Sequence, residues 1–126
     1  VVVAIQLPVP PKGLVGTYKK LGRNRIGDLS IVGVAVAAYP SKDCKSGYQF
    51  RIALASVAPV PFEAIKAEEV LCENKITAEL LDEAAKVAME SVKPIDDVRG
   101  SASYRKHMVK NLTREALTEV WDKLGK

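Results

Sequence analysis

Histidine, cysteine and long apolar runs are scarce in this 126-residue chain, and each scarcity excludes a class of function. His107 is the only histidine, so both a Cys/His zinc site and a histidine-based catalytic triad lack the side chains they need. No apolar run approaches the roughly 20 residues that cross a bilayer, and we expect no membrane span. No basic stretch is followed by a hydrophobic signal core, so we expect a cytoplasmic protein.

The only two cysteines are Cys44 and Cys72. Two free thiols in a reducing compartment are favoured, and a structural disulfide is the alternative. Two cysteines are in any case too few to hold an iron–sulfur cluster within this chain.

Nucleotide-phosphate motifs are missing as well. The sequence contains no Gly-x-Gly-x-x-Gly. Gly22 and Gly27 have the spacing of a phosphate loop, but Asp28 and Leu29 follow where a lysine and a hydroxyl residue are required. We therefore expect no nucleotide phosphate to be held by these residues.

What the chain does have is a basic cluster near its start and a net charge of +4. Such a cluster attracts phosphates or an acidic partner, and a solvated basic face is the alternative. Tyr18 is the one aromatic residue beside it, which is too few for a single-strand stacking surface, so we expect no nucleic-acid binding. The cluster comprises Lys12, Lys19, Lys20, Arg23 and Arg25.

The hydrophobic pattern changes period along the chain. Residues 1–7 are apolar and β-branched and predict a strand already under way, which suggests a piece of a longer chain; residues 8–13 then break it. Residues 30–39 and 48–57 predict a strand pair in an antiparallel hairpin. After residue 61 the period becomes helical. The sequence thus predicts a single α+β domain over residues 1–126, a small antiparallel sheet covered on one face by about three helices.

Three helices are expected in the second half. The first spans residues 62–72, the second is capped by Thr77 and stops before Pro94, and the long last helix is capped by Ser101 or Ser103.

The polar residues between and on these helices have structural interpretations. Asp96 and Asp97 are adjacent, and adjacent side chains rarely point at one spot. With Arg99 nearby, a structural salt bridge or a helix-end cap is favoured over a pair of catalytic carboxylates. His107, beside Lys106 in the last helix, is expected at the surface or at an interface.

Three blocks of the sequence, in order, resemble one known family. They are residues 18–35 (Tyr18-x-Lys20-Leu-Gly-x-x-Arg25-x-Gly-Asp28-Leu29 and the Val32-Gly-Val-Ala run), residues 51–61 (RIALASVAPVP) and residues 94–108 (PIDDVRGSASYRKHM). Together they cover nearly the whole chain. The chain thereby resembles the C-terminal domain of the FAD-binding medium subunit of molybdenum hydroxylases, the family of aerobic carbon monoxide dehydrogenase and xanthine dehydrogenase.

The resemblance implies a function that this chain does not complete alone. An upstream region grips FAD with glycine-rich loops, this module covers the flavin, and partner subunits carry [2Fe–2S] clusters and molybdopterin. Electrons then pass from the substrate through these groups to FAD and on to an acceptor. The resemblance places Lys20 near the flavin ring and the backbone of Val2 near FAD. A free-standing docking or dimerisation module without flavin is the alternative, and for Lys20 the alternative is a solvated lysine.

Overall fold

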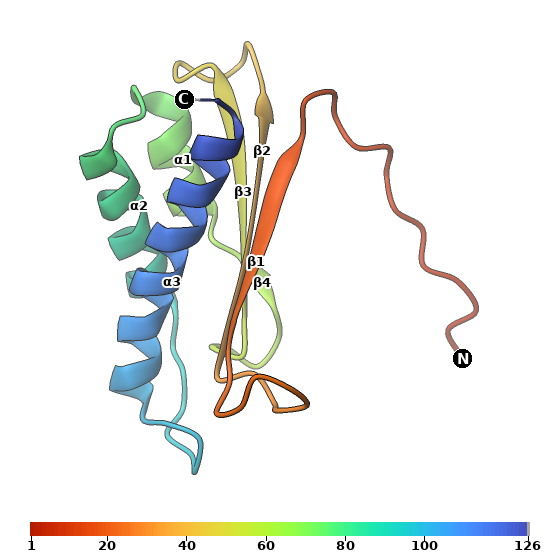
Figure 1. The fold of residues 1–126 in the computed structure, drawn as a ribbon, viewed down its shortest axis with the longest axis vertical. Helices are drawn as coiled ribbons and strands as arrows, with labels where there is room; N and C mark the ends of the chain where they lie inside the picture. The colour runs from red at the N-terminus through yellow and green to blue at the C-terminus, as the bar shows by residue number, and fades with distance from the viewer. Residues whose placement is uncertain (126) are drawn as a thin grey trace.

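A computed structural model of the chain describes residues 1–125, and within them four strands precede three helices (Figure 1). The sheet is antiparallel throughout, in the order β1-β2-β3-β4. The helices cover one of its faces, which confirms the predicted α+β architecture (Figure 1). The elements are β1 (Val15–Leu21), β2 (Val32–Pro40), β3 (Tyr48–Ala55), β4 (Phe62–Glu63), α1 (Ile65–Glu73), α2 (Ala78–Ser91) and α3 (Ala102–Lys123).

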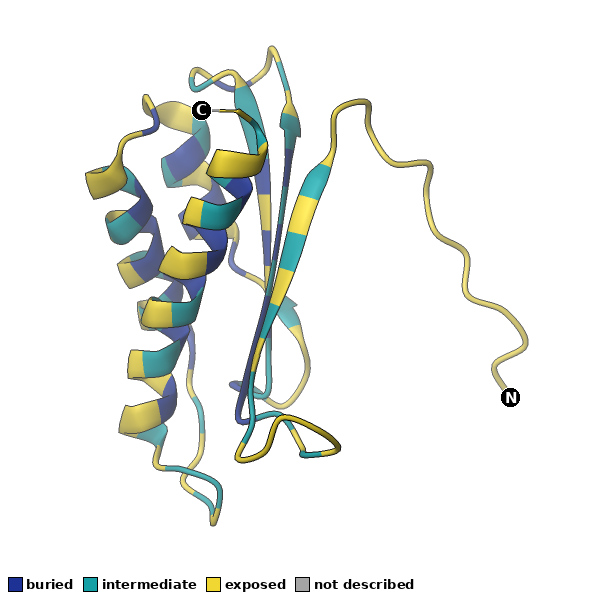
Figure 2. Cartoon of the chain, in the orientation of Figure 1, coloured by how far each residue is buried: buried dark blue, intermediate teal, exposed yellow. Residues whose placement is uncertain are grey.

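The β2–β3 hairpin is the centre of the sheet, and its alternation places one row of side chains in the core. Val36 lies opposite Ile52 and Val34 opposite Leu54. All four side chains are buried against the helices, whereas the intervening residues face away from them, as the period of two requires. Figure 2 shows the same division as a buried layer between the sheet and the helices.

The two longer helices begin where capping residues were predicted. The Thr77 hydroxyl accepts a hydrogen bond from the Leu80 amide at 3.1 Å, and the Ser101 hydroxyl accepts one from the Tyr104 amide at 3.1 Å. Each cap satisfies a donor that the first helical turn would leave unpaired. Of the two serines considered for the last helix, Ser101 is the cap. None of the helices in the described residues combines the length and apolarity that a bilayer crossing requires.

The prediction of a strand over residues 1–7 is wrong. These residues form no regular element, and every one of them is exposed. The segment runs outward from the sheet as an extended arm (Figure 1). An apolar, β-branched sequence favours an extended backbone, but a strand also needs a neighbour for its amides and carbonyls; here the sheet begins only at Val15.

A strand that the sequence analysis did not predict, β1, forms within the basic cluster. Its seven residues pair with β2 from Val15 opposite Ala38 to Leu21 opposite Val32. Lys19 lies on the helix-facing side, where its Nζ is 2.6 Å from Glu119 Oε2 and 3.2 Å from Glu115 Oε1 of α3. These ion pairs let a lysine occupy a position where the alternation calls for an apolar residue. The sequence of β1 therefore lacks the apolar alternation by which a strand is predicted.

The expectation of two free thiols is also wrong. Cys44 and Cys72 form a disulfide that joins the β2–β3 turn to the last turn of α1. The turn is further held by the Ser46 amide, which donates to the Cys72 carbonyl at 3.1 Å. The folded hairpin and α1 bring the two sulfur atoms together across a sequence separation of 28 residues, a proximity that spacing alone does not reveal.

Candidate functional site

The face of the sheet that the helices leave uncovered is lined with small side chains. On β1 the Thr17 hydroxyl donates to Glu119 of α3 at 3.0 Å, so Thr17 faces the helices. The alternate residues of the strand, Tyr18 among them, therefore point to the opposite face. In register with them on β2 and β3 lie glycine and alanine, which make this face flat and mainly apolar. The small residues of this open face are Gly16, Gly33, Ala35, Ala37, Ala53 and Ala55.

A hollow of about 560 Å³ lies on this open face. Its floor is made by the small residues of β1, β2 and β3, and Arg51 and Glu63 line it on the β3–β4 side. Arg51 Nη1 is 3.0 Å from Glu63 Oε1 and 3.1 Å from Glu68 Oε2. The hollow is thus an apolar floor with an ion-paired wall.

Glu68 is a buried carboxylate behind that wall. Its Oε1 accepts a hydrogen bond from the Ile52 amide of β3 at 2.7 Å, and the residue is 3% exposed. Burial raises the pKa of Glu68, against the opposing effect of the Ile52 amide and Arg51. The Ile52 amide lies next to the two-residue strand β4, so Glu68 takes the place of a partner strand at this point.

Tyr18 crosses the other end of the open face. The residue is 58% exposed. Its hydroxyl oxygen is 2.8 Å from the point that a Cβ atom on Gly33 would occupy. A side chain at position 33 would therefore displace the ring of Tyr18. The glycine permits the aromatic side chain to lie close over β2.

Lys20 lies beside Tyr18 at this end and is exposed. Its Nζ donates to the Asp28 carbonyl at 2.6 Å. The Asp28 carboxylate accepts from the backbone amides of Arg23 and Leu29, and the Arg23 amide is the main cause of its lowered pKa. Asp28 thereby closes the β1–β2 loop, and the side chains of Tyr18 and Lys20 stay open to a partner instead of packing inside the fold.

The structure does not bring Val2, the second predicted site residue, to Lys20. Val2 is 81% exposed on the extended arm, which runs outward from the sheet (Figure 1). His107 is exposed on α3, as expected. Within residues 1–125 no three His, Cys, Asp or Glu side chains gather in a way that could hold a metal ion.

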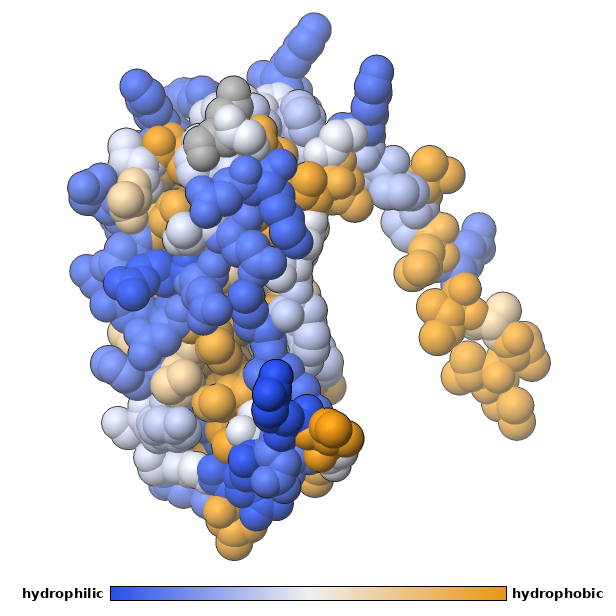
Figure 3. Space-filling view, in the orientation of Figure 1, coloured by the Kyte–Doolittle hydropathy of each residue, from blue (hydrophilic) through white to orange (hydrophobic). Residues whose placement is uncertain are grey.

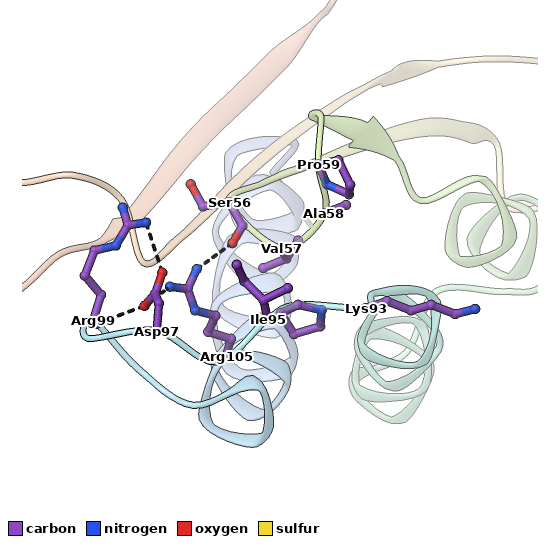
Figure 4. Close-up of a pocket in the computed structure, with 10 residues that line it drawn as sticks. Ser56, Val57, Ala58, Pro59, Lys93, Ile95, Asp97, Arg99 and Arg105 are labelled. Atoms are coloured by element: carbon purple, nitrogen blue, oxygen red, sulfur yellow. Dashed lines mark hydrogen bonds and ion pairs between the residues drawn. The ribbon is translucent and has the colours of Figure 1, made fainter.

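The two aspartates before α3 have structural roles, as predicted. Asp96 Oδ1 accepts from the Ala102 amide at the start of α3. Asp97 Oδ2 is 3.0 Å from Arg99 Nη2. Arg105 also pairs with Asp97: its Nη2 is 2.6 Å from Asp97 Oδ1. This contact was not predicted, because a separation of eight residues gives no sign of it in the sequence (Figure 4).

Comparison with known proteins gives a consistent result. Residues 16–120 match the family model described as the CO dehydrogenase flavoprotein C-terminal domain. The carbon monoxide dehydrogenase medium chain of Hydrogenophaga pseudoflava is 32% identical over 121 residues, which are 96% of this chain and 41% of that protein. The xanthine dehydrogenase FAD-binding subunit of Escherichia coli O157:H7 is 25% identical over 95% of this chain and 41% of its own length.

A solved structure shows the same fold. In the carbon monoxide dehydrogenase of Hydrogenophaga pseudoflava, one chain superposes with a TM-score of 0.82 and 33% sequence identity, over 93% of this chain and 40% of that one. The chain therefore spans about two fifths of the length of these relatives.

Proposed function

This chain belongs to the CO dehydrogenase flavoprotein C-terminal domain family, and from that premise we propose that it covers the flavin in an FAD-carrying subunit of a molybdenum hydroxylase. An upstream region of the same polypeptide holds the pyrophosphate of FAD. The observation that carries the proposal is the open face of the sheet, which is flat, apolar and flanked by Tyr18 and Lys20.

The residues of this chain fit the flavin ring of FAD but not its pyrophosphate. The small side chains of β2 and β3 leave room for a planar ring system against the sheet, with the hollow of about 560 Å³ on the same face. The chain has no glycine-rich phosphate loop, so the pyrophosphate needs residues from elsewhere. This division supports a covering role for the module.

Lys20 is the residue that we assign to the cofactor. When bound, FAD supplies the chemistry of taking up electrons and passing them to an acceptor. The Lys20 ammonium would place a positive charge beside the flavin ring. That charge would stabilise the negative charge that the flavin gains on reduction. Its hydrogen-bond partner is the neutral carbonyl of Asp28 and not a carboxylate.

We assign Val2 to the same cofactor through its backbone. Every residue of the extended arm is exposed, so its main chain is open to a partner (Figure 1). The partner subunits that we expect are the iron–sulfur and molybdopterin subunits of such a hydroxylase, which carry [2Fe–2S] clusters and molybdopterin, in the cytoplasm.

The experiment is Lys20→Met in the full-length subunit. Without the ammonium, the flavin becomes harder to reduce, and we expect its midpoint potential to fall by about 30 mV, roughly 1.4 kcal/mol for a two-electron couple. Lys12→Met is the matched control, because Lys12 is an exposed lysine that precedes β1 and should leave the potential unchanged. Spectroelectrochemical titration measures both.

An unchanged potential in the Lys20 variant would remove Lys20 from the site. The alternative function, a docking or dimerisation module, makes a different prediction: the native complex then contains no flavin at all. Absence of flavin absorbance from the purified native complex would favour that alternative.

A further inference from the structure

The loop between β1 and β2, residues 22–31, is basic and lies mostly in solvent. Residues 23–27 are all exposed, and Figure 3 shows strongly hydrophilic side chains beside a hydrophobic patch at the end of the molecule where this loop lies. At its base the Ile31 amide donates to the Leu21 carbonyl at 2.7 Å. Beyond that bond, an exposed loop keeps one shape only if contacts within the loop hold it.

Asp28 supplies such contacts through its carboxylate. Its side chain is 5% exposed, and the two oxygens accept the backbone amides of Arg23 and of Leu29, the latter at 2.9 Å. Gly22 leaves the space that the carboxylate fills, because a Cβ atom there would be 3.4 Å from Asp28 Oδ2 and 3.3 Å from the Asn24 carbonyl oxygen. The carboxylate is therefore enclosed by the loop and fixes Asp28 next to the end of β1.

The backbone carbonyl of the same residue contacts Lys20. It accepts a hydrogen bond from Lys20 Nζ at 2.6 Å. Lysine has a flexible four-carbon stem, so an unattached ammonium samples many positions, and a bond to a fixed carbonyl selects one of them. The ammonium has three donor hydrogens, so this bond leaves two of them for a further partner.

The neighbouring lysine is held in a different way. Lys19 Nζ lies 2.6 Å from Glu119 Oε2 and 3.2 Å from Glu115 Oε1, so two carboxylates of α3 neutralise its charge. Lys20 forms no ion pair among the described residues, and its partner is a neutral carbonyl. The contact with Asp28 therefore restrains the Lys20 side chain without an ion pair.

We propose that Asp28 is a positioning residue of the flavin site: its carboxylate holds the β1–β2 loop in place, and its carbonyl then holds the Lys20 ammonium for the flavin. The inference rests on the proposed function, which assigns Lys20 to FAD, and it adds the residue that sets where the ammonium lies. Asp28 itself does not need to touch the cofactor, because its carboxylate is enclosed and already accepts two backbone amides.

The sign of a change in flavin potential separates this role from a direct electrostatic one. The pKa of Asp28 is lowered, mainly by the Arg23 amide, so the carboxylate is ionised at neutral pH. If Asp28 acted on the flavin by its own charge, removal of that negative charge would make the flavin easier to reduce and raise its midpoint potential. If Asp28 acts through Lys20, its replacement releases the ammonium and the potential falls.

The experiment is Asp28→Asn in the full-length subunit with its FAD bound. The asparagine side-chain nitrogen is a donor, so one of the two backbone amides loses its acceptor and the loop loosens. We expect the midpoint potential in a spectroelectrochemical titration to fall, in the same direction as in Lys20→Met and by a smaller amount. In the Lys20→Met background Asp28→Asn should cause no further fall, because the ammonium is already absent. Asp43→Asn, at an exposed aspartate of the β2–β3 turn, is the matched control and should keep the wild-type potential.

Gly22→Ala tests the same contact without a change of charge. The added Cβ would lie close to Asp28 Oδ2 and to the Asn24 carbonyl, so the loop has to shift to admit it while every ionisable group is kept. We expect a smaller fall in potential, again absent in the Lys20→Met background. This variant decides the question if Asp28→Asn does not retain FAD.

A raised or unchanged potential in Asp28→Asn, with a lowered one in Lys20→Met, would overturn the role of Asp28 and leave the proposed function intact. A fall that is equally large in the Lys20→Met background would overturn it as well, because Asp28 would then act independently of Lys20. If Asp28→Asn loses its FAD, an unchanged potential in Gly22→Ala overturns the role. An unchanged potential in Lys20→Met, or a wild-type complex without flavin, defeats the proposed function itself and this inference with it.

Discussion

Asp97 joins two arginines, and its protonation is therefore coupled to the stability of the α2–α3 connection. The Arg99 backbone amide first, and then the guanidinium groups of Arg105 and Arg99, hold the pKa of Asp97 at about 2 instead of 3.8. Arg105 in turn fixes the Ser56 carbonyl, in a residue whose φ of 65° lies in the left-handed region. One carboxylate thus supports two segments that are far apart in sequence.

We expect the stabilising effect of Asp97 to disappear in acid. Because the folded pKa is below the unfolded one, the folded state binds fewer protons, and the contribution is complete above about pH 4 and lost as the pH falls through about 2. The difference in urea midpoint between the wild type and Asp97→Asn should therefore be large at pH 5 and small at pH 2. Asp43→Asn, an exposed residue of the β2–β3 turn, is the control. A wild-type advantage over Asp97→Asn that is as large at pH 2 as at pH 5 would contradict the assignment.

The disulfide fastens the β2–β3 turn to α1. The sheet would otherwise hold α1 through β3 packing and through Glu68 at the Ile52 amide. In the unfolded chain the Cys44–Cys72 disulfide closes the loop between these two residues. Such closure stabilises the fold mainly because it restricts the conformations of the unfolded state.

Replacing both cysteines by serine should lower the free energy of unfolding by about 3.5 kcal/mol, as expected for a cross-link over 28 residues. Urea denaturation with and without a reductant measures it. The reductant should destabilise the wild type to the level of the double variant and leave the variant unchanged. A wild type that is insensitive to the reductant under denaturing conditions would show that the disulfide does not form.

Some elements of the fold can be predicted from the sequence and others cannot. The β2–β3 hairpin, α2 and α3 follow from periodicity and capping residues, because these signals are local. The strand β1 was hidden because Lys19 faces the helices, a placement that depends on Glu115 and Glu119 about a hundred residues away. The open face and its hollow could not be predicted, since they require the register of three strands. Lys20 was named from family resemblance, and the structure supplies its exposure and its place beside Tyr18.

The arm and the folded domain are separate structures. Residues 1–10 are all exposed, and Val1, Ile5 and Val9 present apolar side chains to solvent. The apolar core forms instead from β2, β3 and the helices. The arm therefore contributes little to the stability of the fold, and its apolar side chains are available for another surface to bury.

Deleting residues 1–10 should change the free energy of unfolding by less than about 0.5 kcal/mol, in line with other changes at exposed positions. Deleting residues 1–17 is the contrasting variant, because it removes the first part of β1 and the Thr17–Glu119 hydrogen bond, and it should be clearly destabilising. Thermal unfolding followed by circular dichroism compares them. A large loss of stability in the shorter deletion would mean that the arm packs on the domain in solution.

The two edges of the sheet differ in their capacity to grow. Beside β4 the amide of Ile52 is occupied by the Glu68 carboxylate and its carbonyl by the Ala64 amide, so an incoming strand finds neither group available there. On the opposite side β1 has no partner strand other than β2 among the described residues. Its Gly16 carbonyl accepts from Lys123 Nζ at 2.9 Å, and the remaining outer amides and carbonyls are the ones a further strand could use. Extension of this sheet, by an upstream segment or by another molecule, is thus favoured at the strand that carries Tyr18 and Lys20.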